Sequence, residues 1–305
     1  NPNAYPWRSV EHSITPPKPK VLHASKEDPF PQYDAKDYQV GYQSAPWIIK
    51  NLIPQAQFGI IYGDSGSGKT FAALDLAATI ANGQPYRGHK SRADSVLYVA
   101  AEAGEGIKKR LAGYTKEYGV INNLRIMPNA PDLLNVLDAP GMIISTMLHA
   151  KTSLIIIDTL AASHNGDENS SQDMGRVIAQ CKHISNATGA MVLLVHHTGK
   201  TEGKGMRGSS ALFAAADVVI EITAENDIRQ MRTLKQKDGE LLPPFGFALH
   251  QVFLANDQDG DPITTCVVKP AEIPVSSAAI KLNDAVEYIV SVFDNAMGED
   301  RKSTR

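Results

Sequence analysis

The sequence has 305 residues, of which 43% are hydrophobic and 21% are charged, fractions typical of a globular protein. These values exclude wholesale disorder and a fibrous repeat. The 30 basic and 33 acidic residues leave a formal net charge of −3, so nucleic acid would have to bind to a local positive surface. With only Cys181 and Cys266, the chain can form neither a disulfide framework nor a cysteine-built zinc site.

The N-terminus lacks the apolar segment of a signal peptide, and apolar runs such as 154–157 and 190–195 are too short to span a bilayer. We therefore expect a soluble, cytoplasmic protein with no membrane partner. Because the chain does not begin with methionine, we interpret it as a fragment of a longer protein.

The first 45 residues differ from the rest of the chain. Seven of the 18 prolines fall between Pro2 and Pro31, and neither a helical nor a strand period persists there. We predict an extended arm or linker over residues 1–45, with a flexible tail as the open alternative. Residues 46–273 are the expected core. Residues 274–305 are expected to form an amphipathic helix and a charged tail, which we interpret as the start of a truncated module.

Strand and helix patterns alternate along the chain from Trp47 onward. Apolar runs and helical spacings predict strands at 58–62, 95–101, 124–127, 153–158 and 191–195, and helices at 69–82, 107–118, 140–150 and 170–188. Three later strands, predicted at 218–223, 228–235 and 245–254, suggest an antiparallel edge. The pattern predicts an α/β fold, with a mainly parallel twisted sheet and helices on both faces. In such sheets ligands bind beyond the carboxyl ends of the strands.

A glycine-rich stretch between the first of these strands and its helix matches G-x4-G-K-[ST] at every fixed position. It consists of Gly63, Asp64, Ser65, Gly66, Ser67, Gly68, Lys69 and Thr70. Backbone N–H groups in such a loop cradle phosphates at the N-terminus of the helix. Lys69 is expected to neutralise the β- and γ-phosphates, and the Thr70 hydroxyl is expected to bind magnesium. The stretch therefore predicts a nucleoside triphosphate site.

Two acidic residues follow neighbouring predicted strands. Asp158 ends an apolar strand and is the candidate second magnesium-holding residue. It precedes Thr159 rather than a glutamate, so the catalytic base has to come from elsewhere. Glu102, just past the strand at 95–101, is the candidate that would deprotonate the attacking water, and Glu105 is its competitor.

His196 and His197 follow the predicted strand at 191–195. A polar side chain at this position can contact the γ-phosphate and couple hydrolysis to loop movement. His197 is our candidate for this sensor, and a purely structural histidine remains the alternative, above all for His196. The sequence provides no cysteine or acidic partner at ligand spacing, which argues against a metal site here.

The next stretch, 198–210, is basic and glycine-rich, which predicts an exposed loop. Lys200 and Lys204 are candidates for contact with a nucleic-acid backbone. Arg207 is a candidate arginine finger that would reach the γ-phosphate bound to an adjacent subunit. A solvated loop without function is the remaining interpretation.

The combination of these residues resembles the RecA-like hexameric helicases, and most closely the RepA-type plasmid helicase ATPases and their phage-borne relatives. The resemblance spans about 47–223. It is carried by YGDSGSGKT, YVAAEAGEGIKKRL, LIIIDTL, VLLVHHTGK and RGSSAL. It implies an ATP- and magnesium-dependent ring that threads single-stranded DNA, with Lys69, Thr70, Glu102, Asp158, His197 and Arg207 in the roles given above. It also implies that Arg110 packs near the adenine.

The sequence thus favours an ATP-hydrolysing helicase or translocase that forms a homo-oligomeric ring, with single-stranded DNA and other replication proteins as expected partners. A RecA-like ATPase that acts as a switch, a helicase loader or a recombination mediator is the alternative. A small-molecule kinase is weaker, because it would need an acceptor pocket and a lid rather than a basic loop after His197.

Overall fold

The computed structural model describes residues 33–38, 46–55, 57–102, 104–149, 151–197, 210–237 and 239–274. The chain divides into two compact units, Asn1–Ala45 and Pro46–Arg305. In the first unit residues 33–38 are described, and they include the short helix α1 (Ala35–Tyr38). Most of the predicted arm and the helix predicted after Pro274 lie outside the described residues, so these boundaries stay predictions.

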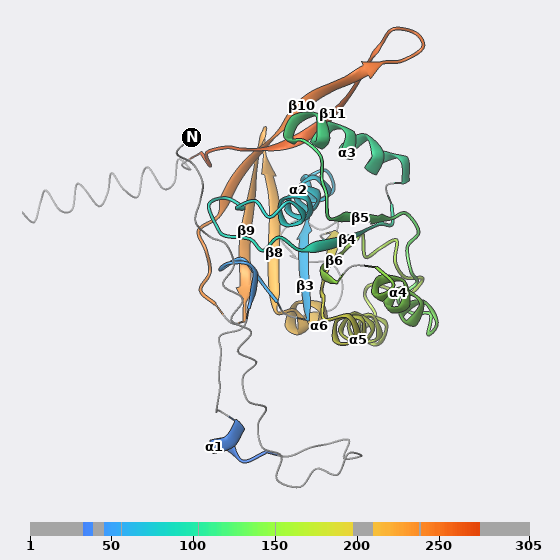
Figure 1. The fold of residues 1–305 in the computed structure, drawn as a ribbon, viewed down its shortest axis with the longest axis vertical. Coiled ribbons are helices and arrows are strands. Elements are labelled where there is room, and N and C mark those ends of the chain that lie inside the picture. Colours follow the sequence, from blue (N-terminus) through green and yellow to red (C-terminus); the bar gives the residue numbers. More distant parts are fainter. Residues whose placement is uncertain are drawn as a thin grey trace, which may run out of the picture. The chain divides into compact units, whose positions relative to one another are not determined.

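The second unit is built on a nine-stranded sheet with the strand order β11-β10-β9-β8-β3-β7-β6-β4-β5 (Figure 1). In chain order these strands are β3 (Phe58–Gly63), β4 (Ser95–Ala100), β5 (Leu124–Met127), β6 (Thr152–Asp158), β7 (Met191–His197), β8 (Val218–Glu225), β9 (Ile228–Gln236), β10 (Phe245–Asn256) and β11 (Pro262–Pro270). A separate two-stranded ribbon pairs β1 (Trp47–Ile49) with β2 (Ile53–Pro54).

The parallel part of the sheet is larger than the sequence suggested. Strand β8 pairs with β3 in parallel, whereas we expected it to begin the antiparallel edge. The antiparallel edge is formed by β9, β10 and β11, and β11 was not predicted at all. The predicted fold class, a mainly parallel sheet with an antiparallel C-terminal edge, is confirmed.

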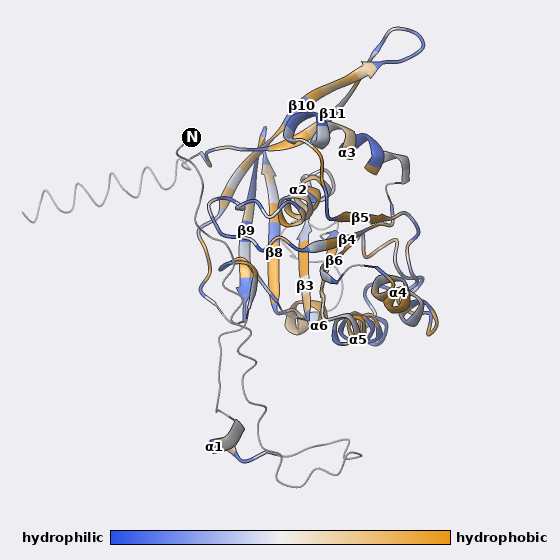
Figure 2. Cartoon of the chain, in the orientation of Figure 1, coloured by the Kyte–Doolittle hydropathy of each residue, from blue (hydrophilic) through white to orange (hydrophobic). Residues whose placement is uncertain are grey.

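Helices cover both faces of the sheet. Helices α2 (Lys69–Ala81) and α3 (Gly104–Tyr118) contribute to the core on one face. Helices α4 (Asp138–Met147), α5 (Ser171–Thr188) and α6 (Ser210–Ala215) pack on the other face. Every residue of β3 and β6 is buried, and the strands β3 and β8 show the orange of hydrophobic residues in Figure 2. Burial on both faces explains why the sequences of β3 and β6 are mostly apolar.

Helix ends follow the local signals in the sequence at most positions. The Ser170 hydroxyl accepts a hydrogen bond from the Asp173 N–H at the start of α5, and Gly189 ends this helix in the left-handed conformation. Helix α4 is displaced from its prediction, since it begins at Asp138 and ends at Met147. Among the described residues, none of the helices has the length and apolar content that a membrane crossing requires.

Candidate nucleotide site

The glycine-rich loop connects the carboxyl end of β3 to the N-terminus of α2, as predicted. Gly68 is the N-cap residue of α2, with a φ angle of 92°, which side-chain-bearing residues rarely adopt. A Cβ atom on Gly63 would lie 2.1 Å from the backbone oxygen of Ile222 on β8, so the loop can follow this path only with glycine there. Gly68 has no side chain to cap α2, and the first helical turn contains no acidic residue. The helix N-terminus therefore keeps donors suited to an anion.

Lys69 is buried, and its ammonium group is held by the loop itself. Its Nζ donates to the backbone oxygens of Gly63 at 2.9 Å and Asp64 at 2.7 Å. Burial lowers the pKa of Lys69, and the negative charges of Asp158, Asp64 and Glu102 act in the opposite direction. A bound polyphosphate would place negative charge directly at this buried cation.

Asp158 is the last residue of β6, and its side chain lies beside the start of α2. It is buried, and burial raises its pKa, while hydrogen bonds from Tyr98 and Thr70 lower it. The Tyr98 hydroxyl donates to Oδ2 at 2.5 Å. Oδ1 is buried and has no hydrogen-bond partner within the described part of the chain. A buried carboxylate that contacts the Thr70 hydroxyl and keeps one orphaned oxygen fits a magnesium ion, which prefers oxygen ligands.

Glu102 follows β4, the strand next to β6 in the sheet. Its Oε1 accepts a hydrogen bond from the Thr159 hydroxyl at 2.5 Å and lies 4.0 Å from Nε2 of His197. The side chain of Glu102 is 48% exposed, which leaves it accessible to water. The competitor Glu105 lies in the first turn of α3, but its side chain is outside the described residues.

The two histidines at the end of β7 differ in their surroundings. His196 is fully buried, and its Nδ1 lies 4.0 Å from Oε1 of Glu168. His197 is only half-buried and faces Glu102. Burial lowers the pKa of His197, and the nearby charge of Lys69 lowers it further. The lowered pKa favours the neutral form of His197 at pH 7, and of the two histidines His197 is the one that faces Glu102.

The structure does not describe three of the site residues that the sequence predicts. Lys200, Lys204 and Arg207 lie outside the described residues. Their predicted contacts with nucleic acid and with a neighbouring nucleotide stay predictions.

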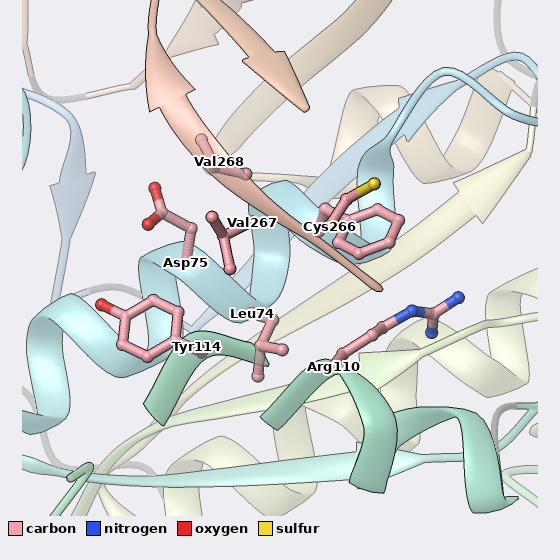
Figure 3. A pocket seen from close by; sticks show the side chains of 8 residues that line it. Leu74, Asp75, Arg110, Tyr114, Cys266, Val267 and Val268 are labelled. Atoms are coloured by element: carbon pink, nitrogen blue, oxygen red, sulfur yellow. The ribbon is translucent and has the colours of Figure 1, made fainter. Parts of the chain in front are cut away.

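Arg110 lies on α3, with its guanidinium carbon 4.9 Å from the centre of the Phe71 ring. Phe71 follows Thr70 directly, so Arg110 packs on the first turn of α2. The two side chains help to line a small pocket between α2, α3 and β11. Arg110 and Cys266 occupy one end of this pocket, and Asp75 and Tyr114 occupy the other (Figure 3). The predicted contact of Arg110 with the adenine remains a prediction.

Sequence reasoning missed three residues of the site: Tyr98, Thr159 and Arg229. The side chain of Arg229 on β9 packs against the loop, since its Nε would lie 3.6 Å from a Cβ atom on Gly68. This Nε is buried and has no hydrogen-bond partner among the residues that the structure describes. A tyrosine in an otherwise apolar buried strand is a usable signal for Tyr98, because its hydroxyl needs a partner. The sequence contains no comparable signal for Arg229.

A family model described as an AAA domain, AAA_25, matches residues 24–203, which is more than half of the chain. The chain belongs to the AAA_25 family. The match begins within the predicted arm and includes the glycine-rich loop, Glu102, Asp158 and the two histidines.

Two solved structures show the same fold. A structure described as an ATPase domain is 15% identical with a TM-score of 0.50, over 64% of this chain and 81% of that one. A DnaB-like replicative helicase, described with its interactions with primase, is 15% identical with a TM-score of 0.51, over 64% of this chain and 56% of that one. The flagellar accessory protein FlaH from Methanocaldococcus jannaschii has a TM-score of 0.43 at 15% identity, over 70% and 90% of the two chains. The chain is thus an AAA_25 protein with the RecA-like P-loop fold of these structures, and it spans little more than half of the DnaB-like chain.

Proposed function

We propose that this chain hydrolyses ATP with magnesium at the glycine-rich loop. The proposal is supported above all by the meeting of Lys69, Asp158, Glu102 and His197, which come from α2 and from the carboxyl ends of β6, β4 and β7. These groups are far apart in the chain, and a parallel sheet brings them to one edge. Each has the chemistry that phosphoryl transfer to water needs.

In this mechanism the backbone N–H groups of the loop bind the phosphates, and Lys69 exchanges its bonds to Gly63 and Asp64 for phosphate oxygens. Thr70 and Asp158 would hold magnesium, which would supply positive charge next to the phosphates. Glu102 takes a proton from a water molecule whose oxygen attacks the γ-phosphorus. The bond between the γ-phosphorus and the bridging oxygen breaks, which releases ADP and inorganic phosphate.

We further propose that the ATPase is a ring-forming replicative helicase or translocase acting on single-stranded DNA. The proposal rests on the combined motifs and is supported by the fold shared with a DnaB-like replicative helicase. Residues 46–273 would be the motor, residues 1–45 an arm or linker, and residues 274–305 a C-terminal helix and tail. Other replication proteins are the expected partners.

The motor proposal is tested by the effect of single-stranded DNA on ATP hydrolysis at low salt. We expect a several-fold increase in the ATPase rate, which Lys200→Ala/Lys204→Ala removes while the basal rate is kept, because backbone contacts depend on positive charge. A flat response in the unmodified protein would contradict the motor and favour a switch, a loader or a recombination mediator.

The ring is tested by mixing two inactive variants. If Arg207 acts on the nucleotide of the adjacent subunit, Arg207→Ala subunits mixed with Glu102→Gln subunits regain part of the activity, because intact halves of two sites then meet at one interface. Native mass spectrometry with magnesium and a nonhydrolysable ATP analogue reports the size of the assembly. Full activity of Arg207→Ala alone would contradict the finger.

A further inference from the structure

Strands β4 and β6 are parallel neighbours, with Ala100 paired to Asp158 at their carboxyl ends. At this edge, each of the two acidic residues, Asp158 and Glu102, accepts a hydrogen bond from a hydroxyl group of the other chain segment. Tyr98 of β4 donates to Asp158 at the end of β6. Thr159 after β6 donates to Glu102 after β4, and both bonds measure 2.5 Å. We call these four residues the crossed hydroxyl–carboxylate pairs.

The Tyr98 pair lies on the face of the sheet that α2 covers. Tyr98 belongs to the core on this face and is fully buried, with its Cα paired to that of Ile156, two residues before Asp158. Because side chains two residues apart share a face, the phenol reaches along the sheet to the carboxylate. A carboxylate accepts and a phenol hydroxyl donates, so Tyr98 is the donor of this bond.

This bond makes the two oxygens of Asp158 unequal. Oδ2 is occupied by Tyr98, whereas Oδ1 is buried without a partner in the described part of the chain. A carboxylate without this bond could rotate and change the oxygen that it presents beside Thr70. The tyrosine therefore keeps Oδ2 occupied and restricts rotation of the carboxylate, which leaves Oδ1 available to a cation.

The Thr159 pair fixes a more exposed group. Thr159 is 2% exposed, and its backbone oxygen accepts a hydrogen bond from the Ser163 hydroxyl at 2.9 Å. The backbone N–H of Ala101 donates to the backbone oxygen of Asp158 at 2.8 Å. This bond joins the two chain segments just before Glu102. Glu102 itself is a long and half-exposed side chain that would otherwise sample several rotamers. The rigid Thr159 hydroxyl restricts it to a pose that faces His197.

We propose that Tyr98 and Thr159 are positioning residues, with Tyr98 orienting Asp158 for the magnesium ion and Thr159 orienting Glu102 for the attacking water. This inference rests on the proposed ATPase function. The two residues act on different steps, so their removal should change different measurements.

The Tyr98 arm is tested by the affinity for a fluorescent nonhydrolysable ATP analogue, measured with magnesium and with EDTA. Tyr98→Phe removes one oxygen. We expect its affinity in EDTA to stay within about 2-fold of that of the unmodified protein. The gain in affinity that magnesium gives over EDTA should fall about 10-fold or more. The matched control is Tyr114→Phe, which removes the hydroxyl of a buried tyrosine elsewhere, on α3. This variant should keep the full gain in affinity from magnesium. The ratio of the two affinities does not depend on the folded fraction.

The Thr159 arm is tested by steady-state ATP hydrolysis. Thr159→Val keeps the shape of the side chain and removes the donor, so kcat should fall about 10-fold or more while KM for ATP and the magnesium dependence stay unchanged. Thr159→Ser keeps the donor and should restore kcat to within about 3-fold. A role in packing alone would give the opposite order, because valine fills the space and serine does not.

Each arm has a result that overturns it. An unchanged magnesium gain in Tyr98→Phe contradicts the orientation of Asp158, and a normal kcat in Thr159→Val contradicts the orientation of Glu102. If the unmodified protein binds the analogue neither with magnesium nor with EDTA, the proposed function itself fails, which is a different result from the failure of either pair.

Discussion

Nε2 of His197 lies 4.0 Å from Oε1 of Glu102, so the ends of β7 and β4 bring the candidate sensor and the candidate base to one place. Hydrolysis should therefore depend on His197 more than nucleotide binding does. We expect His197→Ala to lower kcat about 10- to 100-fold and to change nucleotide affinity by less than about 3-fold. The exposed His183 on α5 gives the control His183→Ala, which should match the unmodified protein. Equal losses in affinity and in kcat would contradict a sensor role.

Lys69 is a buried cation whose ammonium is bonded to two carbonyl oxygens of its own loop. Removing such a charge abolishes phosphate binding but also removes its desolvation cost. We expect nucleotide-free Lys69→Met to be as stable as the unmodified protein, or more stable by about 1 kcal/mol. Magnesium and a nonhydrolysable ATP analogue should raise the melting temperature of the unmodified protein only. Thermal unfolding of both proteins checks this prediction, and a ligand-induced shift in Lys69→Met would contradict it.

The sequence predicted those parts of the site that depend on local patterns. The glycine-rich loop lies between its strand and its helix, and Asp158 and Glu102 follow the strands that were expected to carry them. Contacts between strands were not predictable, because they depend on the strand order. Tyr98 and Asp158 are 60 residues apart, and only the adjacency of β4 and β6 joins them.

The C-terminal edge of the sheet was also only partly predictable from the sequence. Strand β11 begins and ends at Pro262 and Pro270 and contains Thr264 and Thr265, so it has no long apolar run. Its pairing with β10 stabilises it at the sheet edge, where proline is tolerated. The direction of β8 follows from the crossover through α6, a helix too short to give a clear periodicity.

Asp75 on α2 gives a prediction about pH. Burial raises its pKa to about 6, although Arg87 lies 3.3 Å away and acts in the opposite direction. Between the unfolded value near 3.8 and the folded value, the folded state binds more protons, so stability falls as pH rises. The free energy of unfolding should lose about 2 to 3 kcal/mol between about pH 4 and pH 7.5 through this group.

Urea unfolding of Asp75→Asn at both pH values measures this contribution, because the variant lacks the titrating group. The difference in stability between the two proteins should shift by this amount in favour of the variant at the higher pH. Asp227→Asn, at an exposed turn between β8 and β9, is the control. A difference that does not depend on pH would refute the raised pKa.

We expect the substitution of glycine by alanine to have opposite effects on stability at Gly113 and at Gly175. A Cβ atom on Gly113 of α3 would lie 2.1 Å from Cγ2 of Thr265 on β11, whereas one on Gly175 of α5 would meet no atom within 4 Å. Gly113→Ala should therefore lower the free energy of unfolding by about 1 to 3 kcal/mol through overpacking. Gly175→Ala should raise it by up to about 1 kcal/mol, since alanine favours the helix.

Chemical denaturation of both variants checks these signs. Thr265→Ser removes the methyl group that clashes, so Gly113→Ala/Thr265→Ser should recover most of the loss. If Gly113→Ala is as stable as the unmodified protein, α3 does not pack on β11 as closely as the structure has it.

The proposed function requires a triphosphate site in which Glu102 activates the attacking water. The most direct measurement is the release of inorganic phosphate from ATP with magnesium, made together with nucleotide affinity on the same samples of the unmodified protein and of Glu102→Gln. We predict equal affinity and a turnover that is about 100-fold or more slower in the variant. Absence of ATP binding in the unmodified protein, or equal turnover in the two proteins, would contradict the account.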